Sequence, residues 1–126
     1  MLTQVSIMSD HNEIGRKGEQ LAQKLLAQKG YKILETNWRY KKAELDIICI
    51  KDEVLIFVEV KTRSTVKYGQ PEDFVSSAKR RLMFGAANAY MDQINHTWEI
   101  RFDVISIIMN RLYPPKLTHF EDAFFS

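Results

Sequence analysis

The sequence has few of the residues that would assign it to several common protein classes. Among its 126 residues there is one cysteine, Cys49, which excludes an internal disulfide and a multi-cysteine zinc site. The isoleucines on either side of Cys49 indicate ordinary packing in a strand. No apolar stretch approaches the ~20 residues that cross a bilayer, and the N-terminus lacks a basic-then-apolar signal pattern. We therefore expect a cytoplasmic protein that does not contact a membrane.

Several catalytic motifs are missing as well. Glycine is scarce, with five residues, and the chain contains no glycine-rich loop with the lysine that would hold a nucleotide phosphate. No serine has the flanking glycines of a nucleophile elbow. The three histidines, His11, His96 and His119, lack zinc-site spacing, and we interpret each as a surface or turn residue. Nucleotide hydrolysis, serine hydrolysis and histidine-based zinc chemistry are thus disfavoured.

The length and composition are typical of one small globular domain. Hydrophobic residues make up 45% and charged residues 27%, close to the averages for globular proteins. A chain of 126 residues has room for one hydrophobic core. We expect that domain at residues 12–110, with an N-terminal extension at 1–11 and a C-terminal tail at 111–126 that packs on the domain or extends from it.

Hydrophobic periodicity predicts an α/β fold. Helical spacing predicts a helix over residues 12–29, ended by Gly30, and a second helix over 71–91 that begins at Pro71. The predicted strands are residues 31–36, 44–50, 54–61 and 98–108. Residues 51–53 are a connection of hairpin length between the second and third strands. The order helix, strand, strand, strand, helix, strand predicts a mixed central sheet flanked by helices.

Charged residues interrupt the two strands of that hairpin. Glu59 and Lys61 are two residues apart in the third strand, so they project from the same face. Asp46 lies in the neighbouring strand, and hairpin pairing can bring it close to Glu59. Because these strands are otherwise apolar, such charges are costly unless they are paired or bound to a metal.

Two converging carboxylates, Asp46 and Glu59, are suited to Mg²⁺ or Mn²⁺, which bind oxygen ligands. The ammonium of Lys61 could then orient or help to deprotonate an attacking water and stabilise charge on a phosphate. Glu19 borders the apolar face of the first helix and is a fourth candidate. The alternative is structural: Glu59 and Lys61 form an ion pair, and Asp46 ends a strand near solvent.

Basic residues form two clusters, the first at Arg39 to Lys42 and the second at Lys79 to Arg81, although the formal net charge is only +2. Either cluster could contact phosphates or form an ordinary solvated surface. The candidate nucleic-acid-binding residues are Arg39, Lys41, Lys42, Arg63, Lys79, Arg80 and Arg81. Trp38, directly before the first cluster, and Tyr40, within it, could stack on unpaired bases or pack under the first helix, and we favour packing for Trp38.

Four sequence segments carry a resemblance to a known family. They are Gly15 to Glu19, Glu44 to Ile48, the string Phe-Val-Glu-Val-Lys-Thr-Arg at 57–63, and Arg101 to Val104. Together they resemble the small bacterial YraN-like proteins, the uncharacterised family UPF0102. That family resembles the PD-(D/E)-x-K restriction-endonuclease-like superfamily and, within it, the archaeal Holliday junction resolvases.

The resemblance implies a nuclease core that depends on magnesium. By position, Asp46 and Glu59 match metal ligands, Lys61 matches the catalytic lysine, and Glu19 matches the first-helix acid of the resolvase-like members. The chain departs from the usual pattern with Ala43 before Glu44, where glycine is usual, and with Leu45 in place of the motif's proline. Neither departure changes a metal-binding atom.

Two functions from different classes follow. The first is a metal-dependent nuclease that hydrolyses phosphodiesters in DNA, including branched or otherwise structured DNA. The second is a non-catalytic nucleic-acid-binding module with a retained nuclease fold. A homodimer is compatible with the first function, because symmetric cutting of two strands needs two sites.

Overall fold

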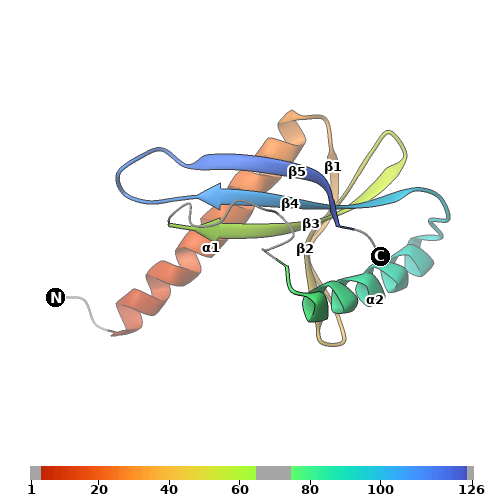
Figure 1. The fold of residues 1–126 in the computed structure, drawn as a ribbon, viewed down its shortest axis with the longest axis horizontal. Helices are drawn as coiled ribbons and strands as arrows, with labels where there is room; N and C mark the ends of the chain where they lie inside the picture. The colour runs from red at the N-terminus through yellow and green to blue at the C-terminus, as the bar shows by residue number, and fades with distance from the viewer. Residues whose placement is uncertain (1–3, 65–74, 125–126) are drawn as a thin grey trace.

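The computed structural model describes residues 4–64 and 75–124, with side chains from residue 13 onward. Its described strands form one sheet, and one helix covers each face (Figure 1). In chain order the elements are α1 (Gln4–Gln28), β1 (Lys32–Tyr40), β2 (Ala43–Lys51), β3 (Val54–Arg63), α2 (Ser77–Ile94), β4 (Ile100–Ile108) and β5 (Lys116–Phe124). The protein thus has a mixed α/β fold of the restriction-endonuclease-like kind, which confirms the predicted fold class.

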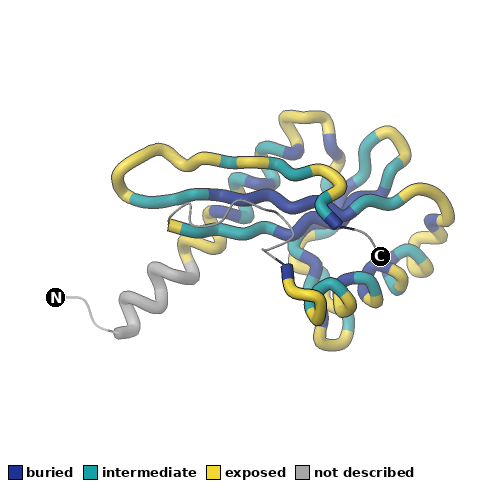
Figure 2. Tube along the Cα trace, in the orientation of Figure 1, coloured by how far each residue is buried: buried dark blue, intermediate teal, exposed yellow. Residues whose placement is uncertain are grey.

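The sheet has the strand order β1-β2-β3-β4-β5, with β3 at its centre. The strand pairs β1-β2, β2-β3 and β4-β5 are antiparallel, whereas β3 and β4 are parallel. Parallel strands need a crossover connection, and α2 lies within that crossover. A central strand is covered on both faces, which is why β3 is buried over residues 55–59 and partly buried at its other positions (Figure 2).

Each face of the sheet has its own hydrophobic core. On the α2 face, Phe57 of β3 packs with Met83 and Tyr90 of the helix. On the α1 face, Ala22 and Leu26, four residues apart in the helix, pack on the strands. Successive side chains of β3 therefore pack into the two cores in turn, with odd-numbered residues facing α2 and even-numbered residues facing α1.

A glycine sets how closely α1 approaches the sheet. A Cβ atom at Gly18 would lie 2.1 Å from Thr62 Oγ1 and 3.2 Å from Thr62 Cβ. Any side chain at position 18 would therefore push the helix away from β3. The close approach brings the next residue, Glu19, to the end of β3 that carries the candidate site.

The predicted hairpin is confirmed. Asp52 and Glu53 join β2 to β3 with φ values of 52° and 69°. Two positive φ values in succession are typical of a type I′ turn, whose twist matches that of antiparallel strands. The turn fixes the register that places Ile47 opposite Val58.

The structure also corrects several predicted boundaries. α1 begins at Gln4 rather than at residue 12, and β1 continues to Tyr40 rather than ending at residue 36. α2 is described from Ser77 to Ile94, and residues 71–74 of its predicted start lie outside the described residues. The C-terminal tail adds a strand, β5, that the predicted order lacked. In the described ranges neither helix combines the length and the apolar character needed to cross a membrane.

Candidate functional site

Asp46 lies where the pairing between β2 and β3 stops. The last paired residues are Ile47 and Val58. Beyond them, Asp46 Oδ2 accepts a hydrogen bond of 2.8 Å from the Val60 N–H. A side-chain oxygen thus takes the place of a strand carbonyl, and the two strands separate around the carboxylate.

Glu59 is the neighbouring carboxylate on β3, and its side chain is only 4% exposed. Its Oε1 atom accepts a hydrogen bond of 2.7 Å from Lys79 Nζ. Its Oε2 atom is buried and has no hydrogen-bond partner among the described residues. An unsatisfied buried carboxylate oxygen costs free energy, so this atom is suited to a further cationic or donor ligand.

The Glu59 carboxylate is close enough to Asp46 to affect the protonation of Asp46. Burial raises the pKa of Asp46 from 3.8 to about 8, and the negative charge of Glu59 adds to the shift. The charge of Glu19 raises the pKa of Asp46 further, by a smaller amount. The structure therefore brings Asp46, Glu59 and Glu19 within electrostatic reach of one another, and a bound cation would relieve their repulsion.

The donor set fits a hard divalent cation. Within the described part of the chain, no three His, Cys, Asp or Glu side chains gather into a complete ligand cluster. Mg²⁺ commonly uses one or two protein carboxylates and keeps several waters, so a pair is sufficient. Asp46 and Glu59 Oε2 are the groups that would hold Mg²⁺ or Mn²⁺.

Two lysines accompany the carboxylates. Lys61 follows Glu59 by two residues on β3, is partly buried, and makes no ion pair with any residue that the structure describes. The ion pair of Glu59 is formed with Lys79 of α2 instead. The structural alternative, in which Glu59 and Lys61 pair, is therefore wrong. Lys79, a predicted phosphate-contacting residue of the second basic cluster, thus contacts a candidate site residue directly.

A pocket of about 330 Å³ opens at Asp46. Its lining residues are Lys42, Ala43, Glu44, Asp46, Lys79, Leu82 and Met83. The pocket lies between the start of β2 and the first turns of α2. Solvent and a small anionic group can thus reach Asp46 and Lys79 from the same side.

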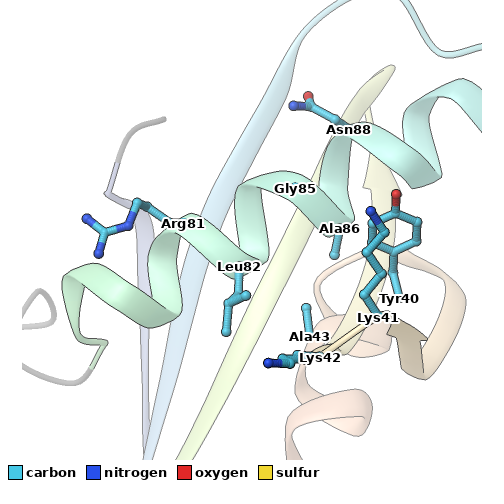
Figure 3. A pocket seen from close by; sticks show the side chains of 9 residues that line it. All are labelled: Tyr40, Lys41, Lys42, Ala43, Arg81, Leu82, Gly85, Ala86 and Asn88. Atoms are coloured by element: carbon cyan, nitrogen blue, oxygen red, sulfur yellow. The ribbon is translucent and has the colours of Figure 1, made fainter.

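Residues of both predicted basic clusters line a second, adjoining pocket of about 460 Å³ (Figure 3). Lys41 and Lys42 contribute from the turn between β1 and β2, and Arg81 contributes from α2. Local sequence patterns do not predict that these residues share a pocket, because the clusters are about 40 residues apart along the chain.

The other predicted basic residues, Arg39, Arg63 and Arg80, make contacts within the protein. Arg39 forms a 2.8 Å ion pair with Glu44. Arg80 Nε donates to the Val75 carbonyl. Arg63 lies at the end of β3 and is partly buried. Trp38 packs edge-on against Tyr90 of α2, which confirms core packing but places it under the second helix rather than the first.

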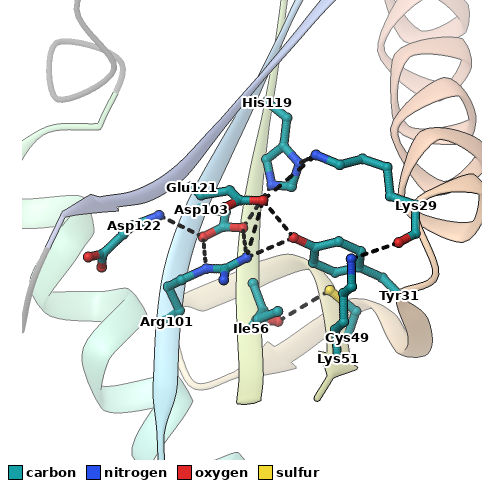
Figure 4. A network of polar contacts seen from close by, with 10 residues as sticks. All are labelled: Lys29, Tyr31, Cys49, Lys51, Ile56, Arg101, Asp103, His119, Glu121 and Asp122. Carbon is teal, nitrogen blue, oxygen red and sulfur yellow. Dashed lines mark hydrogen bonds and ion pairs between the residues drawn. The ribbon is translucent and has the colours of Figure 1, made fainter. Parts of the chain in front are cut away.

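A buried polar network occupies the α1 side of the sheet (Figure 4), whereas Glu59 and Lys61 project from the α2 side. Asp103 of β4 is fully buried and accepts hydrogen bonds from Arg101, from the Asp122 N–H and from His119 Nε2. The side chain of His119 is only 4% exposed, so its assignment as a surface residue is wrong. His96 is buried as well and contacts the Trp98 ring.

The raised pKa of Asp46 predicts how stability depends on pH in the absence of metal. In the unfolded chain this carboxyl loses its proton near pH 4, whereas in the folded protein it keeps the proton to about pH 8. The free energy of unfolding should therefore fall as the pH rises from 4 to 8, by at most about 1.4 kcal/mol per pH unit. We expect Asp46→Asn to lose less stability than the parent between pH 5 and pH 8, measured by urea unfolding with chelator present. Equal losses in the two proteins would contradict this assignment.

Comparison with known proteins gives a consistent family. The model of "Uncharacterised protein family UPF0102" matches residues 18–107. A UPF0102 protein of Flavobacterium psychrophilum is 48% identical over 118 residues, covering 94% of this chain and 98% of the relative. A UPF0102 protein of Natranaerobius thermophilus is 41% identical over 113 residues, covering 87% and 95% of the two chains. The matched range includes every carboxylate and lysine described above, and the chain belongs to the UPF0102 family.

Proposed function

We propose that the protein is a metal-dependent nuclease that hydrolyses phosphodiesters in DNA, branched or otherwise structured DNA included. The observation that carries the proposal is the pair Asp46 and Glu59, with a buried oxygen on Glu59 that has no partner among the described residues and a pKa at Asp46 that is raised by burial and by the charge of Glu59. Neither feature favours the stability of the metal-free fold. Both are accounted for if the pair binds a divalent cation.

The residues of the site have separable roles in this proposal. Asp46 and Glu59 would bind Mg²⁺ or Mn²⁺, and the ion would act as a Lewis acid on a phosphodiester oxygen. Lys61, on the same strand face as Glu59, would orient an attacking water and stabilise the charge that grows on the phosphate. Lys79 holds Glu59 Oε1, which leaves Oε2 available for the cation. Glu19 adds negative charge that increases the attraction for the cation.

Nucleic acid is the favoured substrate because of the charges around the two pockets. Lys42 lines both pockets, and Lys79 lines the pocket that reaches Asp46. Cations on either side of the carboxylates can bind phosphates that flank the reacting one. The same feature supports the second function, a nucleic-acid-binding module without hydrolysis, which differs from the first only in the chemistry at Asp46 and Glu59.

A cleavage screen tests the proposal. Labelled single-stranded, duplex, flap and four-way DNA would be incubated with the protein in Mg²⁺, Mn²⁺ or chelator, beside the matched variant Glu59→Gln. We expect cleavage of at least one DNA form that requires the metal and is lost in the variant. Salt-dependent DNA binding without cleavage in any condition would support the binding module instead. Absence of both binding and cleavage would contradict both functions.

A further inference from the structure

The larger pocket adjoins the Asp46 pocket and lies between α2 and the turn that joins β1 to β2 (Figure 3). The two pockets share Lys42, Ala43 and Leu82 as lining residues. A ligand that occupies one pocket can therefore continue into the other without leaving the surface. The volume of about 460 Å³ is in the range of pockets that hold a small organic molecule.

The lining of this pocket is divided by chemistry. Leu82, Gly85 and Ala86 of α2 make an apolar wall, and the Tyr40 ring adds an aromatic one. Lys41 Nζ lies 5.3 Å from the centroid of that ring, so a base would stack on Tyr40 by displacing this exposed lysine. Asn88 contributes an amide that can both donate and accept hydrogen bonds.

The remaining side chains of the lining set its charge. Lys41, Lys42 and Arg81 are cations, and none of the described residues that line the pocket is acidic. Such a lining suits a flat, largely apolar ring that has hydrogen-bonding groups at its edges and is linked to an anionic group such as a phosphate.

We propose that this pocket holds one unpaired nucleotide of the DNA, with its base against Tyr40 and the apolar wall and its phosphates against the three cations. The inference rests on the proposed function, because it assumes that the adjoining phosphodiester lies at Asp46 and Glu59. Bases in an intact duplex must be unpaired and unstacked before they can enter such a pocket, which costs free energy that an already unpaired nucleotide does not pay. The preferred substrates are consequently DNAs with an unpaired nucleotide beside the reacting phosphate, such as bulges, flaps and single strands.

Gly85 provides the variant that tests this pocket. A Cβ atom built at Gly85 has no heavy atom within 4 Å. Gly85→Leu should therefore place a side chain in the pocket without disturbing the backbone, and Gly85→Ala is the matched control that leaves most of the space open. Both replacements favour the helix over glycine, so neither should impair folding. Tyr40→Leu is a second variant, which removes the stacking surface and keeps an apolar side chain.

The measurement is the dissociation constant for a short duplex and for the same duplex with a one-nucleotide bulge, taken in chelator so that cleavage does not interfere. Base stacking on an aromatic side chain contributes about 5- to 150-fold to affinity. We expect the parent and Gly85→Ala to prefer the bulged DNA by such a factor. In Gly85→Leu and Tyr40→Leu the preference should fall to near one while affinity for the intact duplex stays the same.

Two results would overturn the inference alone: equal binding of both DNAs by the parent, or a full bulge preference in Gly85→Leu and Tyr40→Leu. In either case the proposed function would stand, because the duplex is still bound. Absence of binding to any DNA by the parent would overturn the proposed function together with the pocket. The two failures are thus distinguishable in one experiment.

Discussion

Replacing Lys61 with alanine is expected to slow DNA cleavage by about 10²- to 10⁴-fold, the usual loss for a proton-transfer or charge-stabilising group. Binding of Mg²⁺ should be retained or strengthened, because the variant removes a positive charge beside the carboxylates. Folding should be unaffected, since the described structure gives Lys61 no ion pair to break. Loss of turnover without loss of metal or stability is the pattern that separates this lysine from Asp46 and Glu59.

Single-turnover cleavage and thermal unfolding of the same preparations would test this expectation. Lys116→Ala, which removes an exposed lysine of β5, is the matched control and should cut DNA like the parent. If Lys61→Ala cleaves at the parental rate, or fails only because it unfolds, Lys61 has no part in the chemistry. The nuclease proposal would then lose the residue that distinguishes it from simple metal binding.

Replacing Asp103 with alanine is expected to reduce the free energy of unfolding by about 3–5 kcal/mol, the range for breaking a buried charge pair. Asp103 accepts two hydrogen bonds of 2.8 Å from Arg101, one of 2.8 Å from His119 and one of 2.9 Å from the Asp122 N–H. Burial alone would raise the pKa of Asp103, but these partners, His119 first, hold it below its usual value. The carboxylate thus connects β5 to β4, and its removal leaves the Arg101 charge without its main partner.

Urea unfolding at neutral pH would measure this loss, and Asp92→Ala, at an exposed position of α2, is the control expected to change stability by no more than about 0.5 kcal/mol. Asp103→Asn keeps the shape of the side chain and should lose less than Asp103→Ala. Cleavage per folded molecule should be unchanged in both Asp103 variants, because the network lies apart from the carboxylate site. A loss below about 1 kcal/mol in Asp103→Ala would show that the network does not hold β5.

The sequence predicted most of the features that depend on local pattern. The hairpin of β2 and β3 followed from two apolar runs joined by Asp52 and Glu53, and the parity of β3 correctly separated Glu59 from Val58 and Val60. Because cross-strand neighbours in a hairpin are fixed by register, the proximity of Asp46 to Glu59 could be expected as well.

Features that depend on distant parts of the chain were not predictable in this way. Lys79 reaches Glu59 only because α2 crosses back over the sheet, and 20 residues separate the two in sequence. His119 was predicted to be a surface or turn residue because the histidines lack zinc-site spacing, and its buried partner, Asp103, lies on another strand. β5 was not predicted, because Pro114 and Pro115 directly before it disfavour regular structure, whereas pairing with β4 supplies the hydrogen bonds that extend the sheet. In each case a tertiary contact outweighed the local signal.

The most direct test of the account is calorimetric titration of Mg²⁺ at pH 8 into the parent, Asp46→Asn, Glu59→Gln and Lys61→Ala. At that pH the Asp46 carboxyl is about half ionised without metal, so binding should release protons and strengthen as the pH rises. We predict one Mg²⁺ site in the parent and in Lys61→Ala, and a large loss of affinity in each carboxylate variant. Parental affinity in both carboxylate variants would contradict the assignment of Asp46 and Glu59 as metal ligands and, with it, the proposed nuclease.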